Sequence, residues 1–492
     1  MKYYIGADLG TSALKLLLVN DGGEIVKTVT EEYGVCYPHA GWSEQDPMDW
    51  WQALDRGVKA LLQGVDASAV AAIGVGGQMH GLVLLDEQDR VIRPAILWND
   101  GRTDRETAYF NDVIGKETLS RYTANIAFAG FTAPKLLWVK RNEPENFARI
   151  SKIMLPKDYV NYRLTRVHST DYSDASGMLL LDVQRKRWSP EMLDVCAVSE
   201  KQMPALFESY ETVGTLLPEM AAQWGLPATV KVAAGAGDNA AAAIGTGTVE
   251  SGKCNISLGT SGTVFISSDT FAVDEKNALH SFCHASGKYH LMACILSAAS
   301  CNKWFCEEIL QTNDLAGEQT AITRERLGKN DVYFLPYLMG ERSPINDTDA
   351  RGLFIGLRMD TTRAEMVQAV LEGVAFAIRD NVEIAREQGI DIAFSTLCGG
   401  GARSPLWQTI LCNVLNVEIA LPKTEQGPGY GAAMLAMVAD GKWQSVEACA
   451  KALVEIKSTE TPQSDLVARY EERYKRFKEI YPTVKELYKK LK

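Results

Sequence analysis

The sequence predicts an α/β protein made of two similar halves that face each other. The first observation is a short stretch, Leu-Gly-Thr-Ser, which occurs at residues 9–12 and again at residues 258–261. Each copy stands between two apolar runs, and an apolar run, a small-residue turn and a second apolar run are typical of a β-hairpin. The second observation is the length, because 492 residues exceed what one hydrophobic core accommodates. Two or three domains are therefore expected.

The two turns also predict a ligand. Exposed turn amides and the hydroxyls of Thr11, Ser12 and Thr260 are well placed to hold phosphate oxygens, which suggests a nucleotide between the halves. Only the first copy is preceded by an acid, since Asp8 stands where the second copy has Ser257. The halves are thus expected to share a scaffold but not a role. Two unrelated hairpins with ordinary turns are the alternative reading of these residues.

The first half alternates strands and helices, and polar residues follow two of its strands. The expected elements, in order, are three strands within residues 1–35, a helix over 42–64, strands at 70–75, 83–86 and 91–96, a mainly helical stretch over 103–225 with a small hairpin near 165–182, and a strand at 230–234. Gln78-Met79-His80 and Trp98-Asn99-Asp100 lie at strand ends, where ligand contacts concentrate in open α/β sheets. Hydrogen-bonding groups beside apolar walls suit a polyhydroxylated ligand. A core imidazole is the alternative for His80.

A glycine-rich stretch at residues 245–252 is the best candidate for a domain boundary. We predict an N-terminal domain of residues 1–250 and a C-terminal domain of residues 251–492.

The second half repeats the order of hairpin, strand and helix. A capping box formed by Thr362 and Glu365 predicts the start of a long helix that ends at Gly389. The tail, from about residue 464, is expected to pack as helices onto the body, with a break at Pro482.

Composition restricts the class of protein. Hydrophobic residues make up 46% and charged residues 23% of the chain, as in ordinary globular proteins. The net charge of −11 argues against a nucleic-acid partner, because there is no basic stripe to neutralise phosphates. No apolar run approaches the ~18 residues of a membrane helix, and no signal peptide is recognisable. The ten cysteines are therefore expected to be reduced thiols in a cytoplasmic protein.

Residues 235–240, Gly-Ala-Gly-Asp-Asn-Ala, match the dinucleotide pattern G-x-G-x-x-A after a predicted strand. We reject a dinucleotide site, because a pyrophosphate would lie against the helix N-terminus, where Asp238 would repel it. The helix N-terminus would instead stabilise ionised Asp238 and keep it a competent proton acceptor. A simple helix cap is the alternative role for Asp238.

Of two further glycine-rich stretches, only one is a candidate for ligand binding. Residues 247–254 nearly match a P-loop, but Cys254 stands where a Mg²⁺-binding hydroxyl is needed and a strand follows, so the match is treated as coincidence. Gly399-Gly400-Gly401 lies between a strand and a helix and would let a flat ligand such as an adenine–ribose unit approach the backbone. A plain strand–helix turn is equally open for these glycines.

A stretch rich in histidine and cysteine resembles a metal cluster only superficially. Its residues have no zinc-site spacing and lie among core-like neighbours, so a structural role is favoured; they are His280, Cys283, His284, His290 and Cys294.

Taken together, these segments resemble the FGGY family of carbohydrate kinases over essentially the whole chain. The resemblance is carried, in order, by residues 5–12, 42–47, 77–81, 96–102, 131–136, 155–159, 237–241, 257–262, 280–284, 296–300, 340–344 and 399–404. The segment Gly-Gln-Met-His-Gly at 77–81 resembles members that act on D-xylulose rather than on glycerol, ribulose or gluconate.

The resemblance implies the fold of actin and hexokinase, in which two ribonuclease-H-like domains enclose a cleft. It implies that Asp238 is the general base and that Asp8 positions Mg²⁺ through water. It places Met79, His80, Asp238 and Asn239 on the sugar, and Thr11, Ser12, Gly259, Thr260, Gly400 and Gly401 on ATP. Lys303 lies in a stretch that varies among relatives and receives no role.

The activity that the resemblance implies is ATP- and Mg²⁺-dependent phosphorylation of D-xylulose to D-xylulose 5-phosphate. The alternatives are a kinase of another ketopentose or polyol, a non-catalytic sugar-responsive protein, and an actin-like ATPase that performs assembly work. The presence of both Asp8 and Asp238 favours the kinase, because a sensor needs no base. The partner is expected to be a small sugar, with no nucleic acid or membrane, and a homodimer stays open.

Overall fold

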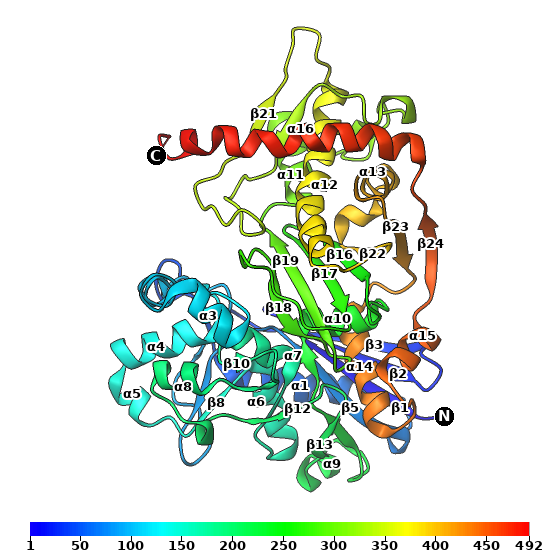
Figure 1. The fold of residues 1–492 in the computed structure, drawn as a ribbon. Coiled ribbons are helices and arrows are strands. Elements are labelled where there is room, and N and C mark those ends of the chain that lie inside the picture. The colour runs from blue at the N-terminus through cyan, green and yellow to red at the C-terminus, as the bar shows by residue number, and fades with distance from the viewer. Residues whose placement is uncertain (492) are drawn as a thin grey trace.

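The computed structural model describes residues 1–491 and contains two bodies, one below the other in Figure 1. Each body is built on a seven-stranded mixed sheet. The sheet of the first body contains β1 (Tyr3–Leu9), β2 (Ala13–Asn20), β3 (Ile25–Glu32), β5 (Val70–Gly77), β13 (Thr212–Thr215), β14 (Lys231–Ala233) and β15 (Ala236–Gly237). The sheet of the second body contains β16 (Lys253–Leu258), β17 (Gly262–Ser268), β18 (His280–Cys283), β19 (Tyr289–Ile295), β22 (Phe394–Cys398), β23 (Glu418–Pro422) and β24 (Ile456–Glu460).

The two sheets repeat one topology. The order β3-β2-β1-β5-β14 in the first corresponds to β19-β17-β16-β22-β23 in the second. β1 pairs antiparallel with β2 and parallel with β5. In the same way, β16 pairs antiparallel with β17 and parallel with β22. The two Leu-Gly-Thr-Ser turns join the first two strands of each sheet, so the predicted pair of similar halves is confirmed.

Helices cover both sheets, and short strands complete the fold. The helices are α1 (Pro47–Leu61), α2 (Asp104–Ala108), α3 (Lys116–Thr123), α4 (Thr132–Asn142), α5 (Pro144–Ala148), α6 (Pro156–Thr165), α7 (Tyr172–Ala175), α8 (Pro190–Cys196), α9 (Pro218–Trp224), α10 (Asp238–Gly245), α11 (Ala299–Trp304), α12 (Arg363–Glu387), α13 (Pro405–Leu415), α14 (Gly427–Asp440), α15 (Val446–Leu453) and α16 (Ser464–Tyr488). The short strands are β4 (Glu44–Gln45), β6 (Val83–Leu85), β7 (Ala95–Ile96), β8 (Lys152–Met154), β9 (Ser169–Asp171), β10 (Leu181–Asp182), β11 (Arg187–Trp188), β12 (Ala205–Phe207), β20 (Tyr333–Leu335) and β21 (Leu353–Ile355).

Helix α14 comes late in the chain but packs on the sheet of the first body, where Figure 1 shows it in orange. The contact is backbone against backbone. A Cβ atom at Gly6 would lie 2.0 Å from the carbonyl oxygen of Gly429, and one at Gly74 would lie 2.1 Å from that of Ala432. The domain boundary at residue 250 stays a prediction. Helix α14 follows that boundary in the chain but packs on the first body.

Two sequence-based expectations about elements are wrong. The hairpin predicted near residues 165–182 is formed instead by β10 and β11, whereas β9 pairs in parallel with the distant β12. A three-residue strand carries too little pattern to indicate its partner. Helix α16 also runs through Pro482 without ending. Pro482 is exposed, so water can satisfy the carbonyl that loses its backbone donor, while Tyr470 and Phe477 hold the helix to the body.

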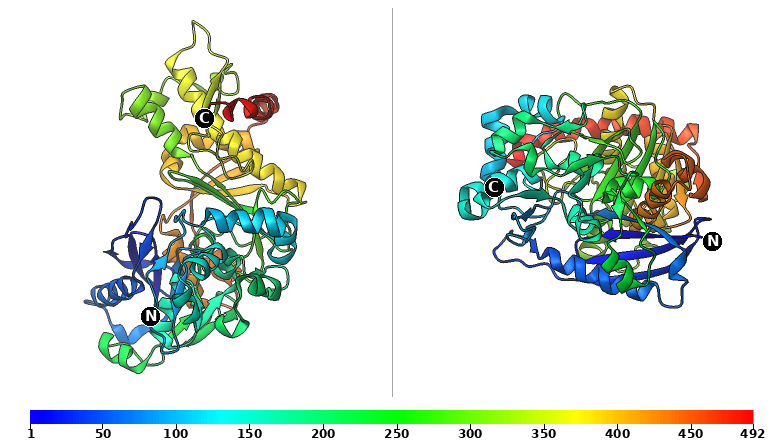
Figure 2. Two further views of the ribbon diagram at one scale, coloured as in Figure 1. Left: turned by 90° about the vertical axis from the view of Figure 1, so that its left-hand side faces the viewer. Right: turned by 90° about the horizontal axis from the view of Figure 1, so that it is seen from below.

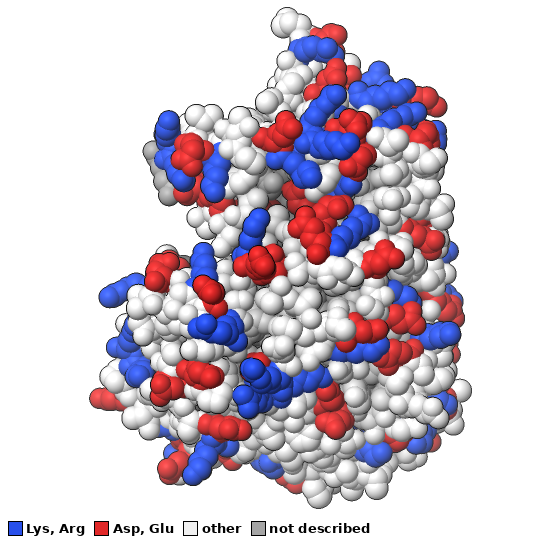
Figure 3. All heavy atoms as spheres, in the orientation of Figure 1, with Lys and Arg blue, Asp and Glu red and all other residues white. Residues whose placement is uncertain are grey.

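The views of Figure 2 show the N-terminus on the first body and the C-terminal helix on the second. Positive and negative side chains are interspersed on the face drawn in Figure 3, and a hollow separates the two bodies there. Within residues 1–491, no helix combines the length and the apolar character needed to cross a membrane.

Candidate active site

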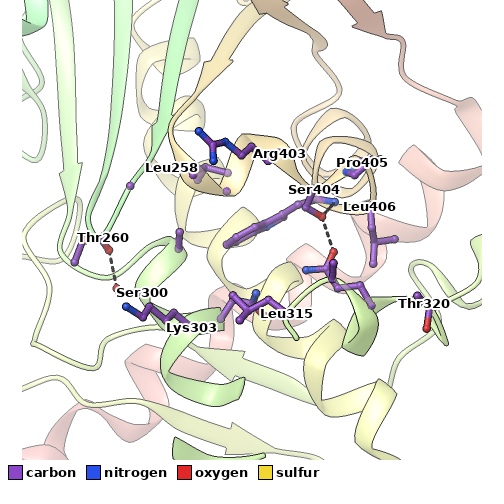
Figure 4. Close-up of a pocket in the computed structure, with 18 residues that line it drawn as sticks. Leu258, Thr260, Ser300, Lys303, Leu315, Thr320, Arg403, Ser404, Pro405 and Leu406 are labelled. Carbon is purple, nitrogen blue, oxygen red and sulfur yellow. Dashed lines mark hydrogen bonds between the residues drawn. The ribbon is translucent and has the colours of Figure 1, made fainter. Parts of the chain in front are cut away.

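Two adjoining cavities lie where the paired sheets meet. The smaller, of about 340 Å³, is lined by Asp238 and Asn239 from α10 and by Gly427 and Pro428 from the start of α14, together with the turn at residues 259–261. The larger, of about 840 Å³, extends into the second body and is drawn in Figure 4. Gly259 and Thr260 line both cavities, so the cavities adjoin at this turn, and Asp238 lines the smaller one.

The larger cavity is mainly apolar. Its walls include Leu258, Leu315, Leu406 and Trp407. Several of its polar groups bond within the wall, since Ser300 Oγ donates to the Thr260 carbonyl at 2.6 Å and Ser404 Oγ donates to Gln319 Oε1 at 2.5 Å (Figure 4). An apolar pocket with few convergent polar groups suits a flat heterocycle.

The glycines at residues 399–401 differ in how tightly their surroundings constrain them. Gly399 has φ +87°, and a Cβ there would lie 2.6 Å from the Leu258 carbonyl oxygen. A Cβ at Gly401 would lie 2.9 Å from the Leu258 Cβ atom. A Cβ at Gly400 would meet no atom within 4 Å. Gly400 and Gly401 line the larger cavity, and only Gly400 has free space for a side chain; their contact with ATP stays a prediction.

Asp238 is the first residue of α10, and it faces the smaller cavity. Its Oδ1 atom accepts from the backbone N–H of Asn239 at 2.7 Å and from Asn239 Nδ2 at 3.1 Å. Burial and repulsion by Asp8 raise the pKa of Asp238 to about 7. We expected the helix N-terminus to keep Asp238 ionised by lowering its pKa, and this expectation is wrong. Burial and the charge of Asp8 raise the pKa by more than the helix N-terminus lowers it.

Asp8 lies on β1, and burial raises its pKa to about 6 while Lys15 opposes that shift. Asp8 and Asp238 repel one another, and two such carboxylates offer the oxygen donors that a hard divalent cation prefers. Residues 1–491 contain no group of three or more metal-binding side chains. The residues thus fit Mg²⁺ that keeps several waters and completes its shell on phosphate, rather than a closed protein cage.

Met79 and His80 follow β5 and are fitted between glycines. A Cβ at Gly237 would lie 2.9 Å from Met79 Cγ, and one at Gly177 would lie 2.5 Å from the His80 ring. Asn239 Nδ2 approaches Met79 Sδ at 3.9 Å. The structure therefore places Met79 beside Asn239 and Gly237, next to Asp238, with His80 following Met79 in the chain. Contact of these four residues with a sugar stays a prediction.

The backbone of His80 is held in an unusual conformation. Its φ of +68° is left-handed, which is uncommon outside glycine. The His80 carbonyl accepts from Lys135 Nζ at 2.9 Å and from Thr132 Oγ1 at 3.1 Å, and the ring stacks on Phe131 with centroids 4.6 Å apart. Burial lowers the pKa of His80 to about 3, so the imidazole is neutral.

Thr11 and Ser12 line neither cavity. The Thr11 hydroxyl accepts from Trp98 Nε1 at 2.9 Å and donates to Gln78 Oε1 at 3.3 Å. Its proton is thus engaged within the first body, and a contact of Thr11 or Ser12 with nucleotide stays a prediction.

Sequence reasoning missed several residues of the larger cavity. Lys303 lines it although no role was assigned, and so do Leu315, Gln319 and Trp407. Gln319 ends a three-residue 3-10 helix, which is too short to show a periodic pattern, so no sequence signal pointed to it.

The stretch rich in histidine and cysteine packs as core. His290 stacks on Phe265 with centroids 3.9 Å apart, and His284 Nε2 donates to the Thr248 carbonyl at 2.9 Å.

Two duplicated sheets, with an apolar cavity that adjoins the cavity of Asp238, are the architecture of a two-domain kinase of the actin and hexokinase type. Residues 3–245 match the FGGY family of carbohydrate kinases, N-terminal domain, and residues 254–439 match its C-terminal domain. The chain belongs to the FGGY family of carbohydrate kinases, which confirms the family, fold and enzyme class predicted from the sequence.

Relatives match along nearly the full chain. The xylulose kinase of Escherichia coli (strain K12) is 44% identical over 477 residues, covering 96% of this chain and 98% of that protein. The xylulose kinase of Bacillus subtilis (strain 168) is 38% identical, with 97% and 96% covered. Among solved structures, a xyloylose kinase from Brucella ovis has a TM-score of 0.94 at 43% identity, covering 99% of this chain and 100% of that one. A gluconate kinase from Lactobacillus acidophilus has a TM-score of 0.93 at 27% identity, with 100% of both chains covered.

Proposed function

We propose that the protein transfers the γ-phosphoryl group of ATP to the terminal hydroxyl of D-xylulose, giving D-xylulose 5-phosphate. The observation that carries this proposal is the shared turn at residues 259–260, which lines both the apolar cavity and the smaller cavity that Asp238 faces. The names of the relatives support the choice of sugar, and the fitted set of Met79, His80 and Asn239 beside Asp238 supports a polyhydroxylated acceptor.

The larger cavity is proposed to hold the nucleoside of ATP, with Gly400 and Gly401 against it. The phosphates would then run past Gly259 and Thr260 toward the smaller cavity. Gly427, at the N-terminus of the fourteen-residue helix α14, lines that cavity, and a helix N-terminus favours phosphate charge.

The sugar is proposed to lie on the first body, where its hydroxyls meet His80 and Asn239 and its carbon face packs on Met79. A thioether can pack on carbon without desolvating a polar group. Gly177 lies against the His80 ring and Gly237 against Met79, so closely that a Cβ atom at either glycine would collide with these side chains.

Asp238 is proposed to accept the proton of the primary hydroxyl as that oxygen attacks the γ-phosphorus. A base with a pKa near the working pH is effective in such a transfer, and the pKa of Asp238 is raised to about 7. Asp8 would hold Mg²⁺ through water. Mg²⁺ bound there would neutralise charge that develops on the phosphates. Closure of the two bodies would exclude water that competes with the sugar as acceptor.

Cysteine chemistry supports a cytoplasmic location for this enzyme. All ten cysteines are unpaired in the structure, and most are buried. Unpaired thiols are typical of a reducing compartment.

The test is ADP release measured with D-xylulose, D-ribulose, glycerol and gluconate in turn, with a sugar-free control. We expect D-xylulose to give the highest kcat/KM, because a site built to bond several hydroxyls rejects analogues that lack or misplace one. A higher kcat/KM for gluconate or D-ribulose would overturn the sugar assignment and leave the kinase assignment standing. ADP release that no sugar accelerates would instead indicate an ATPase.

A further inference from the structure

A lysine and three aspartates form an ion cluster beneath the candidate active site. The side chains of Lys157, Asp158, Asp171 and Asp174 are all 0% exposed. Lys157 Nζ lies 2.8 Å from Asp158 Oδ1, 3.0 Å from Asp171 Oδ1 and 3.9 Å from Asp174 Oδ2. A buried ion cluster is a poor stabiliser, because desolvation offsets the attraction between its charges. Stabilisation of the fold is therefore a poor explanation for the cluster, and positioning of nearby groups is a better one.

The cluster converges on the segment that leads into Asp238. Lys157 Nζ donates to the Ala234 carbonyl at 3.2 Å, and Asn161 Nδ2 donates to the same oxygen at 2.8 Å. The backbone N–H of Gly235 donates to the Ser209 carbonyl at 3.0 Å. The chain between β14 and α10 is thus tied by hydrogen bonds on both sides.

Ser173 carries this connection to the residue next to Asp238. Asp171 Oδ2 accepts from Ser173 Oγ at 2.5 Å, so the hydroxyl proton is directed toward Asp171. The lone pairs of Ser173 Oγ are then free to accept, and the backbone N–H of Gly237 donates to Ser173 Oγ at 3.2 Å. Gly237 immediately precedes Asp238 and also faces Met79.

We propose that Ser173 is a positioning residue for Asp238, oriented by Asp171, which Lys157 in turn holds in place. The proposal rests on the proposed function, since it takes Asp238 as the base. Asp171 also caps α7 through the Ser173 backbone N–H at 2.9 Å, so a purely structural role is the alternative that an experiment must separate.

The chain offers a matched pair of variants. The hydroxyls of Ser173 and Ser209 both donate to Asp171 Oδ2, Ser209 at 2.7 Å, but only Ser173 accepts from Gly237. We expect Ser173→Ala to lower kcat about tenfold or more, because a small misplacement of a reacting group is costly, with both KM values within about threefold. Ser209→Ala should keep kcat within about twofold, and Ser173→Thr, which restores a hydroxyl, should recover most of the loss. Equal losses of kcat in Ser173→Ala and Ser209→Ala, parallel to equal losses of Tm, would overturn the proposal.

A double-mutant cycle separates this proposal from the proposed function. If Ser173 acts through Asp238, Ser173→Ala should cause no further loss of kcat in the Asp238→Asn background. A loss of the same factor in both backgrounds would show that Ser173 does not act through Asp238. Near-normal turnover of Asp238→Asn alone would instead refute the base itself, whatever Ser173→Ala does.

Discussion

His80 donates its Nδ1 proton to the carbonyl oxygen of Gly177 at 2.7 Å. A carbonyl oxygen can only accept, so this bond selects the tautomer whose Nε2 atom is an acceptor. Burial lowers the pKa of His80 to about 3, and the ring therefore stays neutral throughout the physiological range. The residue predicted to recognise the sugar is an acceptor of hydroxyl protons, which the sequence left open.

Replacing His80 by Ala should raise KM for D-xylulose about tenfold, the effect of losing a hydrogen bond and leaving a hydroxyl unpaired. KM for ATP should change less than about twofold, because the nucleotide cavity is separate. The KM for D-xylulose of the variant, divided by that of the wild type, should not vary between about pH 5.5 and 8, since neutral His80 does not titrate there. Steady-state kinetics of His80→Ala, with His168→Ala as a histidine control outside both cavities, measures this. Unchanged D-xylulose kinetics would remove His80 from the sugar site.

Asp238→Asn should nearly abolish transfer while sugar binding survives within about tenfold. The amide keeps the shape of the side chain but cannot take a proton, and loss of a general base typically costs ~10²–10⁴ in rate. Turnover comes from ADP release, and sugar affinity from calorimetry on the same variant. Retention of more than about a tenth of wild-type turnover would make Asp238 a helix residue without a catalytic role.

Asp8→Ala should raise the Mg²⁺ concentration needed for half-maximal turnover and lower the maximum, with sugar affinity nearly intact. The physical reason is that Asp8 is buried and repels Asp238, so a divalent cation would neutralise the two carboxylates together. Titration of activity with Mg²⁺ measures the effect, and Asp21→Ala in the neighbouring turn is the control. A Mg²⁺ curve identical to that of the wild type would exclude Asp8 from the metal site.

Much of the fold could be predicted, because the repeated turn and the strand–helix alternation are local signals. The packing of α14 could not be predicted, since its backbone lies against glycines of β1 and β5 that are far away in the chain. Gly6 and Gly74 read locally as weak strand residues, and only the close approach of α14 explains them.

The motifs in the sequence predicted which residues belong to the candidate site. The pKa values of those residues and the role of Ser173 depend on burial and on neighbours in space. From the sequence we placed Asp238 at a helix N-terminus and expected its carboxyl group to be ionised. In the structure, desolvation and the charge of Asp8 raise the pKa of Asp238 and so favour its protonated form. Such effects arise from what surrounds a residue in space, which spacing along the chain does not reveal. For the same reason Ser173, which belongs to no recognisable motif and lies far from Asp238 in the chain, was not singled out.

Glu341→Gln should alter how stability depends on pH. Glu341 is 1% exposed and accepts from two backbone N–H groups, and burial raises its pKa to about 7 from an ordinary 4.5. The folded protein therefore keeps a proton that the unfolded chain releases, so unfolding free energy falls as pH rises from 4.5 to 7, by about 3 kcal/mol. The glutamine variant lacks this loss. Its Tm should approach that of the wild type at pH 5 and exceed it at pH 8, whereas Glu387→Gln at an exposed site should show no such trend. Parallel Tm curves would contradict the assignment.

Gly400 and Gly401 should respond in opposite ways to added side chains. At Gly400 a Cβ meets no atom within 4 Å, so Gly400→Val should fold normally and fill part of the larger cavity. KM for ATP should then rise about tenfold or more with Tm and KM for D-xylulose little changed, as expected when a ligand loses space rather than the protein its packing. At Gly401 a Cβ lies 2.9 Å from the Leu258 Cβ atom and 3.0 Å from Trp407, so Gly401→Ala should lower Tm by forcing the wall apart. Thermal unfolding and ATP kinetics of the two variants, measured side by side, decide the matter. A Gly400→Val enzyme with an unchanged KM for ATP would show that the nucleoside does not occupy this cavity.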